Sequence, residues 1–148
     1  MDLKTRILDD VKATLKARAA ERLSTLRMLT AAMKQKEVDE RVELDDTAVL
    51  AIVEKLIKQR REAASQFEAG GRADLAAAEK AEIEVLSAYL PAPLSAAEIA
   101  AAIEAALAQT GAQTAKDMGR VMALLKPGLA GRADLARVSA QVKARLAG

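Results

Sequence analysis

Apolar residues recur at spacings of three and four along most of the chain, and this periodicity constrains the fold more than any other feature of the sequence. Residues 114–126 show the i, i+3, i+4, i+7 spacing of one helix face, carried by Met118, Val121, Met122 and Leu125. No run of alternating β-branched residues bounded by turn residues occurs, so strands are not expected. The sequence therefore predicts an all-α protein.

The expected core consists of aliphatic side chains. Aromatic residues make up only 1% of the 148 residues, namely Phe67 and Tyr89, whereas hydrophobic residues together make up 51%. Leu, Ile, Val, Met and many Ala must therefore fill the interior. Alanine and the abundant charged residues also favour helices, because most of these residue types have a high helix propensity.

The first part of the chain predicts four helices, at residues 2–18, 20–39, 46–68 and 74–90. Asp45 or Asp46 is the expected N-cap of the third helix, and Asp74 is the expected N-cap of the fourth. The segment LPAPLS then interrupts the pattern, because two prolines two residues apart suit a short, stiff connector. We therefore expect an N-terminal four-helix domain over residues 1–90.

The remaining chain predicts a small three-helix domain over residues 95–148. Ser95 and Glu98 have the spacing of a capping box at the start of its first helix. The second helix is expected to end at Pro127 and Gly128, and the third to begin near Asp134.

One arginine interrupts the apolar stripe of the expected helix at 46–68. Arg60 stands where the spacing calls for an apolar residue, and the next helix carries Glu79 and Glu82 on its own apolar stripe. Facing positions of an antiparallel hairpin have a nearly constant index sum, and matching Phe67 to Leu75 pairs Arg60 with Glu82.

We predict a structural ion pair between Arg60 and Glu82, with Glu79 one turn away as the alternative partner. Arginine suits this position because its planar guanidinium can meet a carboxylate through two hydrogen bonds. A buried unpaired charge costs several kcal/mol, so the pair would fix the register of the two helices. The alternative interpretation makes both side chains ligand-facing groups in an open cleft.

The residue types exclude several kinds of chemistry. The chain has no His and no Cys, which excludes imidazole and thiolate catalysis, disulfides and the usual zinc sites. No nucleophile motif and no phosphate-binding loop is present, so we predict no catalytic residue, no metal and no cofactor. The N-terminus has neither a signal-peptide nor a transit-peptide pattern, and no apolar run is long enough to cross a bilayer. A cytoplasmic protein without a membrane partner is expected.

The charge distribution favours the C-terminal part for contact with an acidic partner. The net charge is −1 over residues 1–90 and +3 over residues 91–148. Few aromatic residues are available for stacking on bases, so nucleic-acid binding would rest on contacts to phosphates. The candidates for such contacts are Lys116, Arg120, Lys126, Arg132, Arg137 and Arg145. Taken singly, each of them is also an ordinary solvated surface charge.

Four segments carry a family resemblance: ERLSTLRMLTAAMKQKE, IKQRRE, FEAGGRADLAAAEKAEIEVLSAYLP and DMGRVMALLKPGLAGRADLARVSAQVKARL. They resemble the GatB/YqeY family of small bacterial proteins over essentially the whole chain. The family is similar to the tail of the B subunit of the glutamine-dependent aspartyl/glutamyl-tRNA amidotransferase. The resemblance implies an all-helical fold with a larger N-terminal bundle and a three-helix C-terminal domain.

The resemblance also implies a function. The chain is expected to be a non-catalytic, tRNA-associated module whose partner is tRNA or a tRNA-amidotransferase-like complex, and a monomer is expected. A carbon–nitrogen ligase activity with glutamine as amido-N-donor would then belong to the larger enzyme. The alternative is a protein–protein adaptor without a nucleic-acid role, which an exposed Leu/Met groove beside the helix of Met118 and Met122 would favour.

Overall fold

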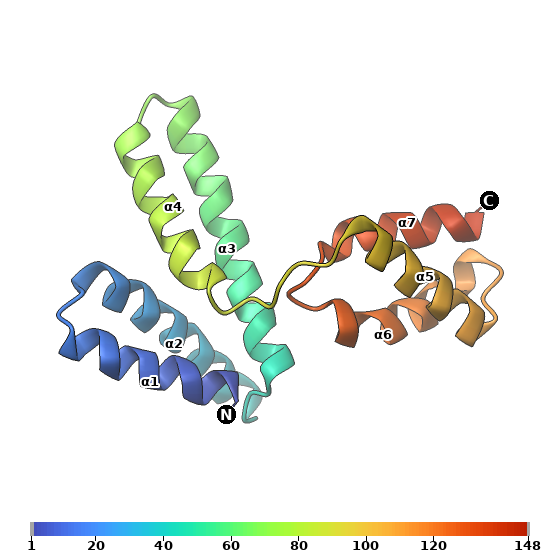
Figure 1. The fold of residues 1–148 in the computed structure, drawn as a ribbon, viewed down its shortest axis with the longest axis horizontal. Coiled ribbons are helices and arrows are strands. Elements are labelled where there is room, and N and C mark those ends of the chain that lie inside the picture. Colours follow the sequence, from blue (N-terminus) through green and yellow to red (C-terminus); the bar gives the residue numbers. More distant parts are fainter. Residues whose placement is uncertain (1, 148) are drawn as a thin grey trace. The chain divides into compact units, whose positions relative to one another are not determined.

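The computed structural model describes residues 2–147, and within that range the fold is all-α, as predicted (Figure 1). No strand occurs among the described residues. The chain divides between Leu90 and Pro91 into two compact units, which we call unit 1 and unit 2. Each unit has a hydrophobic core of its own.

Unit 1 consists of two helical hairpins (Figure 1). The first hairpin joins α1 to α2 and the second joins α3 to α4 through a turn that contains Gly70 and Gly71. The four helices are α1 (Leu3–Lys16), α2 (Ala20–Glu40), α3 (Asp46–Ala69) and α4 (Ala73–Ser87). Gly71 has a φ of 74°, a left-handed conformation that favours glycine, so the chain reverses there.

The N-termini of these helices follow from local hydrogen bonding, with one correction. The Asp45 side chain accepts the Ala48 N–H at 2.9 Å and caps α3. The prediction that Asp74 caps α4 is wrong, because the helix begins one residue earlier with Arg72 at the N-cap. The Arg72 N–H donates to the Phe67 carbonyl at 2.8 Å, which closes the turn and places Asp74 in the first helical turn.

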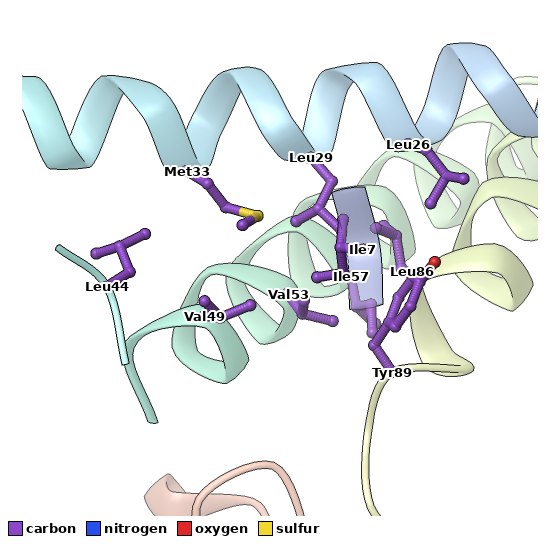
Figure 2. Packing of buried hydrophobic residues seen from close by; sticks show 10 residues of the cluster. All are labelled: Ile7, Leu26, Leu29, Met33, Leu44, Val49, Val53, Ile57, Leu86 and Tyr89. Atoms are coloured by element: carbon purple, nitrogen blue, oxygen red, sulfur yellow. The ribbon is translucent and has the colours of Figure 1, made fainter. Parts of the chain in front are cut away.

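The core of unit 1 draws on all four helices (Figure 2). Figure 2 shows its side chains pointing toward one another from α2 on one side and from α3 and α4 on the other. Its buried members are Ile7, Leu26, Leu29, Met33, Leu44, Val49, Val53, Ile57, Leu86 and Tyr89. Nine of these ten side chains are aliphatic, so removal of apolar surface from water is the main term that stabilises the unit.

Tyr89 is the one aromatic residue in this core. The residue is 3% exposed, and its hydroxyl donates to Asp10 Oδ2 at 2.6 Å. The Arg6 guanidinium carbon lies 5.1 Å from the ring centroid, which is within the range of a cation–π contact. Burial, followed by the hydrogen bond to Asp10, raises the pKa of the Tyr89 phenol well above its usual value of 10.0.

This raised pKa can be tested directly, because Tyr89 is the only tyrosine of the chain. We expect the phenolate absorbance of the native chain to appear at a higher pH than that of the denatured chain. A folded-state pKa above the unfolded one means that the stabilisation is complete below about pH 10 and is lost as the pH rises toward the folded value. The free energy of unfolding should therefore fall more steeply above about pH 10 in the wild-type chain than in Tyr89→Phe. Coincident native and denatured titrations would contradict the burial of this hydroxyl.

Unit 2 consists of helices around a second aliphatic core. A capping box starts α5, since the Glu98 N–H donates to Ser95 Oγ at 3.1 Å and the Ser95 N–H donates to Glu98 Oε1 at 3.2 Å. The elements are α5 (Ala96–Thr110), a 3₁₀ turn η1 (Ala115–Asp117), α6 (Met118–Leu129) and α7 (Leu135–Ala147). The buried core residues are Ile103, Ala106, Val121, Leu125, Leu129, Val138, Val142 and Leu146.

The predicted end of the second helix in this unit is wrong. α6 continues through Pro127 and Gly128 to Leu129. A proline in the last helical turn removes a single backbone hydrogen bond, and Leu129, which is 2% exposed, holds that turn against the core. The Ala130 N–H still donates to the Lys126 carbonyl at 2.9 Å, so the turn closes in spite of the proline.

Candidate functional site

A groove of about 540 Å³ lies between α5 and α6 in unit 2. Residues of α5 that share one helix face line one side of it, and residues from the second half of α6 line the other side. The lining residues are Leu94, Glu98, Ala101, Ala102, Ala105, Ala106, Gln109, Leu124, Leu125, Gly128, Leu129 and Arg132. The composition makes the groove largely apolar.

The walls of this groove combine small side chains with one exposed large one. Ala101 and Ala105 are exposed on α5, and Leu124 of α6 is 41% exposed. Gly128 of α6 has no side chain. Apart from its chain neighbours and the backbone of its own helix, no heavy atom of the described residues lies within 4 Å of where a Cβ would stand. A partner could therefore approach the helix backbones closely.

The two charged residues of the groove are already engaged within unit 2. Glu98 accepts the Ser95 N–H, and this hydrogen bond lowers the pKa of its carboxyl group. Arg132 Nε donates to the Ala92 carbonyl at 2.9 Å, which ties the turn after α6 to the segment that precedes α5. The groove thus offers apolar contact and no charged group without a hydrogen-bonding partner.

Four of the six predicted phosphate-binding cations also have partners within unit 2. Arg132 is held by Ala92, and Arg120 pairs with Asp117, whose pKa is lowered to about 2, first by the Gln113 N–H and then by Arg120. The ion pairs of the other two are Arg137 with Asp134 at 3.9 Å and Arg145 with Glu104, where two hydrogen bonds measure 2.8 and 2.7 Å. Lys116 and Lys126 are exposed, and their ammonium groups have no hydrogen-bonding partner among the described residues.

The cluster around Arg60 lies in unit 1, where α2, α3 and α4 meet. Arg60 Nε donates to Glu82 Oε2 at 2.9 Å, and Nη1 donates to the Leu56 carbonyl at 2.9 Å. Nη2 contacts the sulfur of Met28 on α2. The Arg60 side chain is 10% exposed and that of Glu82 is 38% exposed. All three nitrogens are therefore occupied, whereas Glu79 takes no part in the cluster.

No group of three or more acidic, His or Cys side chains that could hold a metal occurs within residues 2–147. No helix in that range is both long and apolar enough to cross a membrane. The buried side-chain polar atoms of the described residues all have partners, so no unsatisfied group points into a cavity.

The comparison with protein families decides the family. The model described as Yqey-like protein matches residues 4–146, which is nearly the whole chain. The chain belongs to the YqeY-like protein family. The match spans both units of this YqeY-like chain.

Individual relatives of the YqeY-like chain come from fungi. Altered inheritance of mitochondria protein 41, mitochondrial, of Eremothecium gossypii is 38% identical over 103 residues, which cover 68% of this chain and 56% of that protein. The protein of the same name in Lachancea thermotolerans is 33% identical over 91 residues, which cover 61% of this chain and 49% of that protein. Uncharacterized protein C22F3.15 of Schizosaccharomyces pombe is 29% identical over 89 residues, which cover 60% of this chain and 69% of that protein. The chain spans about half the length of the first two.

These relatives overturn two predictions. The predicted tRNA-associated module resembling an amidotransferase tail is wrong, because three relatives carry the name Altered inheritance of mitochondria protein 41. The expected cytoplasmic location is contradicted as well, since the same three proteins are named as mitochondrial. Most of the candidate cations form ion pairs or hydrogen bonds within unit 2.

The α5–α6 groove was not placed by the sequence. The sequence directed attention to Met118 and Met122, which are only half-buried and pack against the core of unit 2. The exposed side chain is Leu124 instead. A usable signal was present, since Ala101 and Ala105 are one helical turn apart on α5 and lie outside its apolar stripe.

Proposed function

We propose that this YqeY-like chain is a protein-binding module that holds an amphipathic helix of a partner in the α5–α6 groove. The observation that carries the proposal is an apolar groove of about 540 Å³ with exposed Leu124 on its wall. Ligand sites of this size are typically concave and mostly apolar. A partner helix is the occupant because the groove runs between two helices, as in other helix-in-groove complexes.

The walls determine which side chains the partner should present. Ala101, Ala105 and Gly128 leave space, so large apolar side chains of the partner would fill it. An amphipathic helix presents such side chains at i, i+3, i+4 and i+7. Because Glu98 and Arg132 are engaged within unit 2, binding should depend little on salt.

The test uses the full chain and a designed helical peptide with Leu at i, i+3, i+4 and i+7 and uncharged polar residues elsewhere. We expect Ala105→Glu to weaken binding by about tenfold or more, because the complex would bury a carboxylate without a partner. Fluorescence anisotropy of the labelled peptide measures the affinity. Since Ala105 is exposed in the free chain, the variant should keep its thermal stability.

The matched control is Ala108→Glu, which makes the same change on the same helix at an exposed residue outside the groove. It should bind the peptide as the wild-type chain does. Equal losses in both variants, or no binding to the wild-type chain, would contradict the proposal. Self-association that Ala105→Glu abolishes would assign the groove to a second copy of the chain instead.

The likeness of unit 2 to the amidotransferase tail stays a prediction and carries no part of this proposal. Support for protein binding comes from the groove alone, and the names of the relatives say nothing about a partner protein. The two ideas are separable, because the apolar peptide tests the groove without reference to nucleic acid.

A further inference from the structure

A second groove, of about 470 Å³, lies in unit 1 between α2 and α3. Its lining residues come in helical spacing from the second half of α2 and the first half of α3. They are Ala32, Gln35, Lys36, Asp39 and Glu40 from α2, and Ala51, Ile52, Lys55, Leu56 and Gln59 from α3. The groove belongs entirely to unit 1, so it is separate from the one between α5 and α6.

The floor of this second groove is apolar and is supported by the core of unit 1 and by Arg60. Ile52 and Leu56 are half-buried and also pack against the core of unit 1. Arg60, one turn after Leu56 on α3, donates to the Leu56 carbonyl and contacts Met28, one turn before Ala32 on α2. The arginine therefore connects the two helices that form the walls.

The walls carry cations that are free to meet a partner. Lys36 lies on α2 and Lys55 on α3, and the ammonium group of neither has a hydrogen-bonding or ion-pair partner among residues 2–147. The two acidic residues, Asp39 and Glu40, lie at the end of α2, and Asp39 keeps its charge while it accepts a hydrogen bond from the Gln35 amide at 2.8 Å. The four charges of the lining sum to zero, but Lys36 and Lys55 lie in the middle of the two lining stretches, so the charge there is positive on both walls.

We propose that the α2–α3 groove binds an amphipathic helix of a partner protein that carries carboxylates on both flanks of its apolar face. The apolar face would cover Ile52 and Leu56, and the carboxylates would meet Lys36 and Lys55. This site goes beyond the α5–α6 groove, because it lies in the other unit and selects its partner by charge. A chain with both sites can hold two different helices.

Other occupants fit this groove less well. The phosphate backbone of a nucleic acid would match the lysines and leave the apolar floor without contacts. A second copy of the chain could offer the exposed Leu8 and Leu15 of α1, which are 42% and 54% exposed. Lys12 lies between those two leucines in the sequence, one turn after Leu8, and would bring a like charge toward the lysines of the groove.

The test compares two labelled helical peptides on the full chain. Both have the same apolar residues at i, i+3, i+4 and i+7, and one has Glu and the other Lys along the flanks. We expect the acidic peptide to bind at least about tenfold more tightly at low ionic strength, with a smaller difference at high ionic strength because salt screens exposed charges. Equal affinities of the two peptides would overturn the proposal.

Charge reversal in the groove tests the residues. Lys36→Glu combined with Lys55→Glu should reverse the preference, so that the basic peptide binds more tightly. The matched control is Lys34→Glu combined with Lys58→Glu, which makes the same change in net charge at exposed residues of the same helices outside the groove. Loss of the preference in the control as well would show a general charge effect and overturn the assignment to this groove.

A third variant separates this proposal from the proposed function. Ala105→Glu, in the α5–α6 groove, should leave the preference for the acidic peptide unchanged, whatever it does to the uncharged peptide. Ile52→Gln places an amide on the floor of the α2–α3 groove. It should weaken binding of the acidic peptide by about tenfold and leave the affinity for the uncharged peptide unchanged. If Ala105→Glu instead weakens binding of the acidic peptide as much as binding of the uncharged one, both peptides bind in unit 2 and the second site is refuted.

Discussion

Replacing Leu29 by Ala should lower the free energy of unfolding of unit 1 by about 3–5 kcal/mol. Leu29 lies in the middle of α2 and is fully buried in the core of the unit (Figure 2). The substitution removes apolar contacts and leaves a cavity, because the helices around the site relax only partly. Denaturant unfolding followed by circular dichroism measures the loss.

The control for this substitution is Leu8→Ala on α1. Leu8 is 42% exposed, so the same chemical change should cost less than about 1 kcal/mol. Hydrogen exchange adds a second readout, since protection should fall in the amides of unit 1. Equal losses of unfolding free energy in Leu29→Ala and Leu8→Ala would contradict the burial of Leu29 in the core.

The second large effect concerns the Arg60–Glu82 ion pair. Glu82→Met should cost about 1–3 kcal/mol, because it leaves the guanidinium of a 10% exposed side chain without its carboxylate. Arg60→Met should cost less, since Glu82 is 38% exposed and water can solvate it after the loss of its partner. The difference in burial thus predicts unequal costs for the two halves of one ion pair.

The double variant with Met at both positions separates a structural role from a ligand-binding one. Met side chains at both positions leave no unpaired charge, so the double variant should recover much of the stability that Glu82→Met loses. A double-mutant cycle of unfolding free energies measures the coupling between the two side chains. Costs that simply add, with no coupling, would show that the contact does not stabilise the helix register.

The position of Arg60 also connects stability to the proposed binding in unit 1. Its guanidinium contacts Leu56 and Met28, and Leu56 lines the α2–α3 groove. The arginine is therefore placed to hold the two walls at a set distance while the free lysines contact the partner. Arg60 itself does not line this groove.

Much of the fold follows from local sequence patterns. Helix periodicity predicts the all-α class, and the spacing of Ser95 and Glu98 predicts the capping box, because these interactions join residues three or four apart. The index sum of a short hairpin pairs Arg60 with Glu82, and the two side chains are 2.9 Å apart. Such features are readable because the chain connects the partners within one helix or one tight turn.

Only the tertiary structure decides the contacts between distant segments. The Tyr89 hydroxyl meets Asp10, 79 residues away, and Arg145 meets Glu104, 41 residues away, and no local pattern announces either pair. Both grooves arise in the same way, from the angle and spacing at which whole helices pack. The sequence by itself determined where helices form and which faces are apolar, since these depend on neighbours along the chain. Which charges remain free for a partner depends on side chains that packing brings together from far apart, and this the tertiary structure alone decided.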